Sequence, residues 1–433
     1  MRRIILQEGE KLKESDLSRK GAFNAQAMAS ATAIIDDVRA RGDEALREYT
    51  AKFDGVEIED FRVSQAAINE AVAKCDPHVA ECLEHAASQI REFHERQVKQ
   101  SWFEERENGA FVGTKYTPLD SVGIYVPGGR ALYPSSLLMN ALPASVAGVK
   151  RIVCCTPPTK DGSLDPAILK AAQLCGISEI YTVGGSQAIG ALAYGTQTIA
   201  PVCKVTGPGN AFVAAAKKIV SGDCGIDMIA GPSEVCVVAD ESADPMLVAI
   251  DLMAQAEHDP LATCYLVTTS EAYVDQVERW IDKHMQESTR VEITTASLND
   301  HGTVVVCPNM ATALEAVNVI APEHLELHFE GAMNKLGAVR NAGAIFVGEW
   351  TAEAVGDYVA GPNHTLPTGG TARFSSPLSV DDFVKKSSVI CYSAEALASD
   401  ADAVITIAHH EGLWAHAHSV ELRKEIIGGK AQA

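Results

Sequence analysis

From Ser121 onward, short aliphatic and β-branched runs alternate with helical stretches of about ten residues. This pattern is typical of βαβ units, in which helices join parallel strands and cover the sheet. We therefore expect an α/β fold with two doubly wound, incomplete Rossmann-like parallel-sheet domains. The expected strands are 122–126, 151–155, 179–183, 202–206, 235–239, 262–268, 303–306 and 344–348, and the expected helices are 135–147, 165–175, 187–194, 210–220, 244–257, 271–287 and 310–320.

The residue pattern differs on either side of this alternation. Residues 28–52 and 65–97 show helical spacing of apolar residues, with breaks at Arg41-Gly42-Asp43 and at Asp76-Pro77. After Gly348 a segment rich in Gly, Pro and Thr leads into an extended C-terminal tail. This tail is too short to bury a core of its own, so we expect it to pack on a partner subunit.

The composition excludes several classes of function. The net charge of −21 disfavours nucleic acid or an anionic membrane as a partner, because both bind surfaces rich in Lys and Arg. The N-terminus has no signal peptide, and no apolar run reaches the roughly 18 residues of a membrane span, so we expect a cytoplasmic protein. The eleven cysteines never form a Cys-x-x-Cys pair, which argues against disulfides and a thiolate zinc site.

Two glycine turns follow expected strands and open helices. They are Val183-Gly184-Gly185-Ser186-Gln187 and Thr206-Gly207-Pro208-Gly209-Asn210. Glycines let a phosphate approach the backbone, and a helix N-terminus supplies N–H donors. Neither turn matches the dinucleotide fingerprint G-x-G-x-x-G, because Phe212 stands at the third glycine of the second turn. Each is thus either a phosphate-binding loop or a tight structural turn.

A carboxylate and an imidazole stand side by side at Glu323-His324, after the proline of Ala321-Pro322. Such a pair offers two proton acceptors of different basicity, which suits a reaction with more than one proton transfer. Gln255 and His258 share one helix face, while Asp357 and His416 lie in glycine-marked segments. These oxygen and nitrogen donors suit Zn²⁺, although each histidine could equally be an ordinary surface or core residue.

Motifs along the whole chain resemble those of the histidinol dehydrogenase family. They occur in one order from residue 41 to residue 413: Arg41-Gly42-Asp43, Lys52-Phe53-Asp54-Gly55, Tyr125-Val126-Pro127-Gly128-Gly129, Tyr133-Pro134-Ser135-Ser136, Ala230-Gly231-Pro232-Ser233-Glu234, Gln255-Ala256-Glu257-His258, Pro322-Glu323-His324-Leu325, Gly356-Asp357-Tyr358, Gly361-Pro362-Asn363-His364 and Glu411-Gly412-Leu413. The resemblance implies an NAD-dependent homodimer with one Zn²⁺ per subunit. It would oxidise L-histidinol through L-histidinal to L-histidine, with two NADH formed, in the last step of histidine biosynthesis.

The same resemblance implies a role for individual residues. Glu323 and His324 match the family's acid/base pair. The implied zinc ligands are Gln255, His258, Asp357 and His416, and the implied NAD contacts are Tyr125, Gln187 and Asn210. Ser233, His364 and Glu411 would surround the substrate together with Gln255, His258, His324, Asp357 and His416. Glu411 and His416 would serve the site of the other subunit, because the family's tail crosses the dimer.

The expected domains follow from the strand pattern and the resemblance together. They are an N-terminal arm (1–20), a larger α/β domain (21–120 with 235–372), an NAD-binding Rossmann-like domain (121–234) and the crossing tail (373–433). Three other functions fit parts of the pattern. They are a related dehydrogenase of another primary alcohol, such as a sulfonated diol, a zinc hydrolase whose Glu323 activates a metal-bound water, and a zinc-binding interaction protein without activity.

Overall fold

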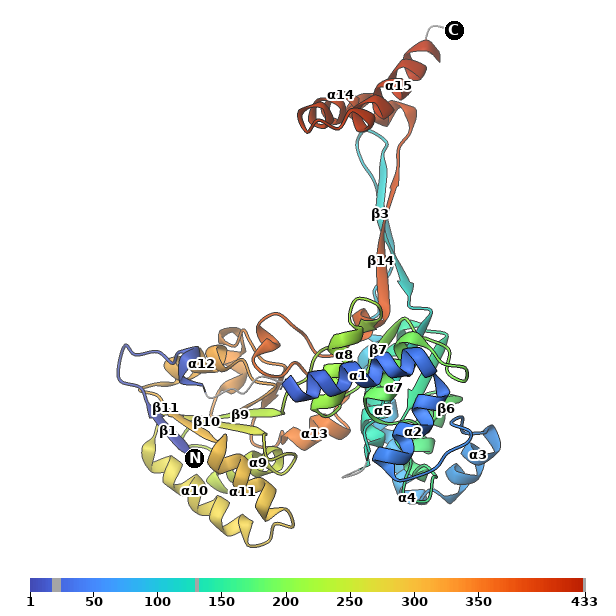
Figure 1. Cartoon of the computed structure of the whole chain (residues 1–433). Helices are drawn as coiled ribbons and strands as arrows, with labels where there is room; N and C mark the ends of the chain where they lie inside the picture. The colour runs from blue at the N-terminus through green and yellow to red at the C-terminus, as the bar shows by residue number, and fades with distance from the viewer. Residues whose placement is uncertain (18–24, 129–131, 431–433) are drawn as a thin grey trace. The chain divides into compact units, whose positions relative to one another are not determined.

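The computed structural model describes residues 1–17, 25–128 and 132–430. Gly129 of the motif Tyr125-Val126-Pro127-Gly128-Gly129, residues 18–20 of the predicted arm and residues 21–24 of the predicted larger domain lie outside these ranges. The chain divides into two compact units, Met1–Gln97 with Leu119–Phe383 and Val98–Pro118 with Val384–Ala433 (Figure 1). No helix among the described residues is both long and apolar enough to span a bilayer.

The first unit contains a five-stranded parallel sheet in the order β6-β5-β4-β7-β8. Its strands are β4 (Ser121–Tyr125), β5 (Arg151–Cys155), β6 (Glu179–Tyr181), β7 (Lys204–Thr206) and β8 (Gly225–Ile226). The chain builds this sheet outward from β4 to β6 and then resumes on the other side of β4 with β7. The direction of winding therefore reverses between β4 and β7, which is where doubly wound sheets bind ligands.

Helices cover both faces of this sheet and form two apolar clusters. One cluster joins α3 (Gln65–Lys74), α4 (Pro77–Glu95), α5 (Pro134–Ala147) and α6 (Pro166–Leu174). The other joins α1 (Ala25–Arg41), α2 (Asp43–Asp54), α7 (Gly185–Tyr194) and α8 (Ala211–Val220). The predicted larger domain combined residues 21–120 with the second sheet, whereas the apolar side chains of the helices α1 to α4 pack on the first sheet. The exact domain boundaries stay a prediction.

A second parallel sheet of the same unit has six strands in the order β1-β11-β10-β9-β12-β13. The strands are β1 (Arg2–Ile5), β9 (Glu234–Ala239), β10 (Thr263–Thr268), β11 (Thr303–Val306), β12 (His324–His328) and β13 (Ala344–Val347). Its helices are α9 (Pro245–Ala256), α10 (Glu271–Met285), α11 (Val291–Asp300), α12 (Met310–Ile320) and α13 (Glu353–Tyr358). The prediction of two doubly wound parallel sheets with flanking helices is confirmed.

Local sequence signals explain why most predicted helices begin where they do. Asp76, Asp165 and Asp244 each accept N–H groups of the following turn, and each is followed by a proline at the first helical position. The predicted breaks are confirmed, because α1 ends at Arg41 and α4 begins at Pro77. In the first unit the strands β1, β8 and β12 and the helices α11 and α13 were missed.

The strand β12 was missed because the predicted strands were nearly continuous apolar runs, whereas its sequence His-Leu-Glu-Leu-His alternates polar and apolar residues. Such alternation usually indicates a strand with one face in water. All five residues are nevertheless buried, and β9 and β13 flank them on both sides. A buried strand face that carries two histidines and a glutamate requires polar partners inside the protein.

The segment after α13 is tied to α4 and α5 through a buried histidine. The side-chain amide of Asn363 donates to the backbone oxygen of Met139 at 2.6 Å and lies 3.4 Å from Nε2 of His94. Nδ1 of His94 lies 2.7 Å from the backbone oxygen of Ile90, the ideal place for its N–H to donate. Both nitrogens are thus satisfied in the neutral ring, and burial lowers the pKa of His94.

A histidine that stays neutral when buried makes stability depend on pH. Below the ordinary pKa of about 6.5, His94 binds a proton in the unfolded chain but not in the folded protein. The free energy of unfolding therefore decreases as the pH is lowered, by up to about 1.4 kcal/mol per pH unit for this group. We expect the stability advantage of the wild-type protein over His94→Gln to shrink between pH 7.5 and 5.5. Urea unfolding of both proteins between pH 7.5 and 5.5 measures the difference in their free energies of unfolding. A difference that stays constant with pH would contradict a neutral, buried His94.

The second unit is an antiparallel sheet in the order β14-β3-β2 with two helices. Its elements are β2 (Trp102–Glu105), β3 (Phe111–Pro118), β14 (Val384–Cys391), α14 (Ala394–His410) and α15 (Trp414–Lys430). The buried apolar residues among those described here are all alanines, namely Ala110, Ala396, Ala401, Ala408 and Ala417.

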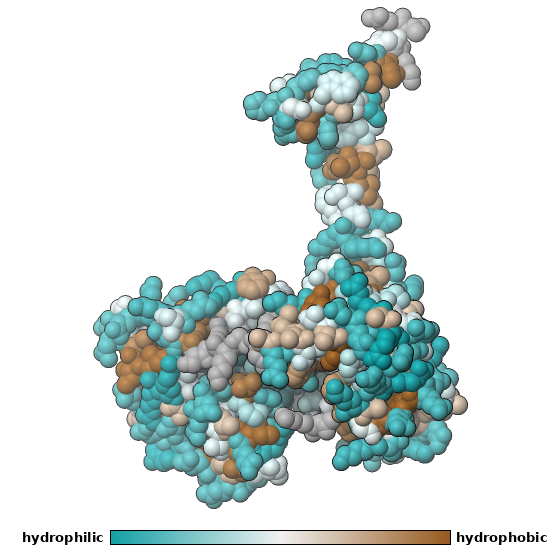
Figure 2. All heavy atoms as spheres, in the orientation of Figure 1, coloured by the Kyte–Doolittle hydropathy of each residue, from teal (hydrophilic) through white to brown (hydrophobic). Residues whose placement is uncertain are grey.

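Large apolar side chains of this unit face outward instead. The exposed set includes Trp102, Phe103, Phe111, Ile390, Val404, Ile407, Leu413, Trp414, Leu422 and Ile426. Figure 2 shows hydrophobic surface along the hairpin and on the two helices. A monomeric soluble protein rarely exposes so many large apolar groups, so this surface is suited to a protein partner.

Candidate active site

The pair Glu323-His324 lies at the amino end of β12, and both side chains are buried. The carboxylate of Glu323 accepts the backbone N–H of Glu234 at 2.9 Å, so the start of β9 orients it. Burial raises the pKa of Glu323 well above 4.5, against the effect of this hydrogen bond. The two side chains are neighbours, with Nδ1 of His324 3.9 Å from the Glu323 carboxylate.

The ring of His324 has different surroundings at its two nitrogens. Nδ1 lies 3.2 Å from the backbone oxygen of Glu234 and 3.0 Å from the side-chain amide of Gln255. The amide of Gln255 is best satisfied with its nitrogen toward these acceptors. Nδ1 can therefore donate to Glu234 in one tautomer and accept from Gln255 in the other, while Nε2 is buried without a hydrogen-bond partner. This leaves Nε2 free to exchange a proton with a ligand.

Burial also fixes the resting charge of this imidazole. It lowers the pKa of His324 to about 3, with a further contribution from the nearby His258 and His364. The ring is therefore neutral near pH 7 and carries a lone pair that can accept a proton. A general base needs this state before the reaction begins.

Two carboxylates of α13 flank the ring of His324. Glu353 lies 3.6 Å from Nδ1, and Asp357 lies 3.8 Å from Nε2. Burial raises the pKa of Asp357 to about 6 and that of Glu353 well above 4.5. Asp357 was a predicted site residue, whereas Glu353, which stands one helical turn earlier on the same face, was not. That i, i+4 pair of acids was the available signal.

Three of these side chains form a group that could hold a metal ion. Ligand atoms of His258, Glu353 and Asp357 all lie within 4.8 Å of one another. The unpartnered Oε2 of buried Glu353 and the adjacent amide of Gln255 add further donors. Nitrogen and carboxylate donors without thiolates suit Zn²⁺, so the residues fit the ion that the resemblance implies.

His364 also belongs to this neighbourhood. Its Nδ1 lies 2.9 Å from the backbone oxygen of Asp357, and burial lowers the pKa of His364 to about 4. Ser233 directly precedes β9, and its backbone oxygen accepts the N–H of Thr263 at 2.9 Å. The structure thus brings Glu323, His324, Gln255, His258, Asp357 and His364 together and places Ser233 next to Glu234 in the chain. Glu411 and His416 lie in the second unit, and their roles stay predictions.

This group occupies an unexpected edge of the second sheet. Glycine turns at the carboxyl ends of strands were the first sites considered, following the rule for open α/β sheets. The group instead surrounds the first residues of β9 and β12, at their amino ends. Gln255 comes from the last turn of α9 and His258 follows that helix, because helices between parallel strands run back to the amino edge.

The predicted nucleotide contacts lie at the carboxyl edge of the first sheet. The hydroxyl of Tyr125, the last residue of β4, accepts the N–H of Gly185 at 3.1 Å. Asn210 caps α8 by accepting the N–H groups of Phe212 and Val213. Gln187 is buried, and its Oε1 has no hydrogen-bond partner. An orphaned buried oxygen at a helix N-terminus fits a ligand at this switch point, although the NAD contacts stay predictions.

The second glycine turn has a structural requirement of its own. Gly207 has a φ of 118°, and a side chain there would collide with the backbone of Tyr125. Its N–H donates to Asp227 at 2.9 Å, and its oxygen accepts from Lys217 at 2.9 Å. Lys217 and Asp227 also form a buried ion pair with each other. These hydrogen bonds and the ion pair stabilise the turn in one conformation next to β4.

Comparison with known proteins places the chain in a family. The family model for histidinol dehydrogenase matches residues 17–424, nearly the whole length. The chain belongs to the histidinol dehydrogenase family. This membership confirms the family and the enzyme class that the motifs predicted.

Individual histidinol dehydrogenases are similar to this chain over most of their length. The one from Bacillus subtilis (strain 168) is 53% identical over 394 residues, which cover 91% of this chain and 92% of the relative. The one from Clostridium acetobutylicum is 50% identical, with 96% of both chains covered. The crystal structure of histidinol dehydrogenase from Elizabethkingia anophelis superposes with a TM-score of 0.92 at 36% identity and 99% coverage of each chain.

Proposed function

We propose that this protein is an NAD-dependent, zinc-containing dehydrogenase that oxidises L-histidinol through L-histidinal to L-histidine. The observation that carries the proposal is the neutral, buried His324. Its Nδ1 lies near Glu323 and Glu353, and its Nε2, which has no hydrogen-bond partner, lies 3.8 Å from Asp357. A primary alcohol becomes a carboxylate through two oxidations, and each one must release a proton. Two adjacent groups that can accept protons fit this requirement.

In the first oxidation His324 acts as the general base. Its Nε2 takes the proton of the alcohol while hydride leaves the carbinol carbon. This step uses the tautomer in which Nδ1–H donates to the backbone oxygen of Glu234. Bound NAD⁺ supplies the hydride acceptor. Histidinol is a cation, and its charge would favour the ionised forms of the nearby carboxyl groups of Glu353 and Asp357, whose pKa values burial raises.

The second oxidation requires that the aldehyde be hydrated first. We assign Glu323 to remove a proton from the attacking water, because its carboxylate is fixed by Glu234 3.9 Å from His324. His324 then takes the proton of the hydrate as the second hydride leaves. The two residues thus divide water activation and alcohol deprotonation between them.

Four protein ligands are proposed for the zinc ion, namely Gln255, His258, Asp357 and His416. Bound Zn²⁺ would offer positions for the amine and imidazole nitrogens of histidinol and so orient the alcohol toward His324. Glu353, which the sequence did not single out, lies close enough to His258 and Asp357 to support this ligand set. His364 holds the turn of Asp357 through its contact with the backbone oxygen.

The stoichiometry of the reaction tests the proposed function. We expect two NADH per histidinol consumed, loss of activity on chelation and recovery on addition of Zn²⁺. Absorbance of NADH with limiting histidinol and product analysis of histidine measure this ratio. One NADH with release of free aldehyde would overturn the four-electron reaction. A zinc hydrolase or a binding protein would give no NADH, and a related dehydrogenase would oxidise another alcohol, such as a sulfonated diol, faster than histidinol.

We further propose that a second copy of the chain covers the apolar surface of the second unit. That unit buries only alanines while it exposes large aromatic and aliphatic side chains, so it lacks a core of its own. It also carries Glu411 and His416, which the family resemblance assigns to the site of the partner. The proposed homodimer therefore has sites that draw residues from both chains.

Complementation between two inactive variants tests whether the sites are shared. We expect His324→Gln and His416→Ala to be inactive alone and to recover about a quarter of wild-type activity when refolded together, because half of the dimers are mixed and one of their two sites is intact. Mixing each variant with itself serves as the control. Sites built within a single chain would give no recovery.

A further inference from the structure

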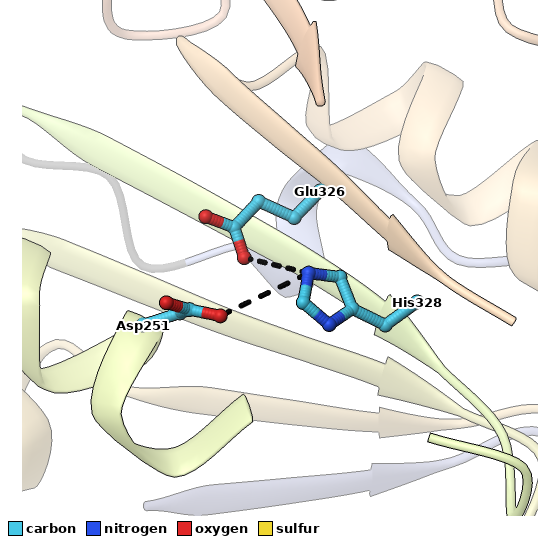
Figure 3. Close-up of side chains that lie close together, drawn as sticks. All are labelled: Asp251, Glu326 and His328. Carbon is cyan, nitrogen blue, oxygen red and sulfur yellow. Dashed lines mark ion pairs between the residues drawn. The ribbon is translucent and has the colours of Figure 1, made fainter. Parts of the chain in front are cut away.

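A second buried polar cluster lies two to four residues beyond His324 along β12. Figure 3 shows Glu326 and His328 of this strand and Asp251 of α9 pointing toward one another. Nε2 of His328 lies 3.2 Å from Glu326 and 3.8 Å from Asp251. The three residues are buried, with Glu326 fully excluded from solvent. None of them takes part in the proposed proton transfers.

The cluster continues the polar face that begins at His324. Alternate residues of a strand share one face, so His324, Glu326 and His328 face the same way. Asp251 and Gln255 stand one turn apart on α9 and contact His328 and His324 respectively. The strand and the helix thus form two polar tiers, one at the candidate site and one behind it.

Glu326 connects the two tiers through a single hydrogen bond. Its Oε1 accepts the backbone N–H of Glu353 at 3.1 Å, and this bond is buried. Glu353 is the first residue of α13, and the preceding Ala352 has no side-chain acceptor with which to cap the helix. A carboxylate from β12 therefore supplies the N-terminal cap that the helix lacks locally.

The position of α13 decides where two carboxylates of the candidate site lie. Glu353 and Asp357 both come from this six-residue helix and flank His324 on its two sides. A helix this short has little stability of its own, so its contacts determine where it sits. Gly356 rests against the ring of Phe346, where a Cβ would come within 2.5 Å of the ring, and the Glu326 bond fixes the first turn.

We propose that Glu326, held by His328 and Asp251, is a positioning residue that seats α13 and thereby places Glu353 and Asp357 around His324 and the metal ligands. The imidazole between the two carboxylates holds the Glu326 side chain in the orientation that reaches Glu353. Although burial opposes it, the carboxylates of Glu326 and Asp251 raise the pKa of His328, which favours an imidazolium here. The catalytic part of this inference rests on the proposed function, whereas the seating of α13 does not.

Two substitutions of nearly equal size separate the hydrogen bond from simple packing. Glu326→Gln keeps an oxygen that can accept the N–H of Glu353, whereas Glu326→Met removes it. In hydrogen exchange we expect the amides of 353–358 to exchange at least about tenfold faster in Glu326→Met and within about threefold of wild type in Glu326→Gln. Equal protection in all three proteins overturns the proposal.

Zinc binding gives a second readout, independent of turnover. We expect Glu326→Met to weaken Zn²⁺ binding by about 10- to 100-fold in competition with a chelator, with a parallel fall in kcat, and Glu326→Gln to stay close to wild type. The matched control is Asp165→Ala, which removes the cap of α6 far along the chain and should leave zinc binding unchanged. A loss of affinity equal in both variants would mean general destabilisation and would overturn the proposal.

A rescue variant tests the capping role directly. Ala352 has the extended conformation of an N-cap residue, so Ala352→Ser can supply a cap from within the chain. In the Glu326→Met background we expect it to restore part of the exchange protection and of the zinc affinity. If Glu326→Met does not fold, Glu326→Met/His328→Leu/Asp251→Leu removes all three members of the cluster and leaves no unpaired buried charge. The same rescue by Ala352→Ser is expected there, and its absence overturns the proposal.

The cluster could instead hold a metal ion, because ligand atoms of Asp251, Glu326 and His328 lie within 4.8 Å of one another. Counting the bound metal ions distinguishes the two roles. Elemental analysis of the wild-type holoenzyme is expected to give one zinc ion per chain. A second ion that disappears in Asp251→Asn would make the cluster a metal site and overturn the positioning role. Should wild-type protein fail to oxidise histidinol, the proposed function fails alone, because hydrogen exchange and zinc competition still report on Glu326.

Discussion

Replacing His324 with glutamine is expected to lower kcat for histidinol oxidation by about two to four orders of magnitude. Glutamine can still donate to the backbone oxygen of Glu234, so the packing around β12 is kept. It cannot accept the proton that Nε2 of the neutral imidazole would take. KM for histidinol is expected to change little, because the loss concerns a proton transfer in the transition state rather than binding.

Steady-state kinetics of NADH formation with histidinol, and separately with histidinal, measure this effect. Both rates should fall, since His324 is assigned a role in each oxidation. The matched control is His284→Gln, a partly buried histidine on α10 whose Nε2 lies 3.3 Å from the backbone oxygen of Met246. A His324→Gln protein with kcat within tenfold of the control would remove the imidazole from the mechanism.

Replacing Glu323 with glutamine is expected to separate the two oxidations. Glutamine retains an oxygen for the N–H of Glu234, so the geometry is preserved, but it cannot remove a proton from water. We expect histidinal oxidation to fall about 100-fold or more, while the first oxidation keeps most of its rate. The yield of NADH per histidinol should therefore drop from two toward one, with aldehyde trapped by semicarbazide.

The control for this substitution is Glu330→Gln, an exposed acid just beyond β12. Its NADH yield and rate on histidinal should equal those of the wild-type protein. Turnover of histidinal by Glu323→Gln at the wild-type rate would rule out the division of labour between Glu323 and His324. A loss of both oxidations together would instead assign Glu323 to the first step as well.

Much of the fold could be predicted from local sequence signals. The strands 151–155 and 303–306 and the helix 310–320 have the predicted bounds, because buried strands are nearly continuous apolar runs and helices are marked by caps and prolines. The strand β12 could not be found in this way. Its polar residues face α9 rather than water, and this partner is 70 residues away in the chain.

The candidate site could be predicted only in part. Motif resemblance identified Glu323, His324, His258 and Asp357, which the structure brings together. It did not identify Glu353, because the spacing of four residues between Glu353 and Asp357 indicates a shared face only if the segment is a helix, and this short helix was not predicted.

The sequence by itself determined which chemical groups this protein has, which family it resembles and where most of its strands and helices lie. These properties depend on residue type and short-range spacing, which the chain carries directly. Only the tertiary structure decided that the acid/base pair starts a buried strand, at the amino edge of the sheet, with a neutral His324. It also decided that Glu326 caps a helix that begins 27 residues later in the chain. Burial and hydrogen bonds between distant segments set these features, and neither is encoded in local spacing.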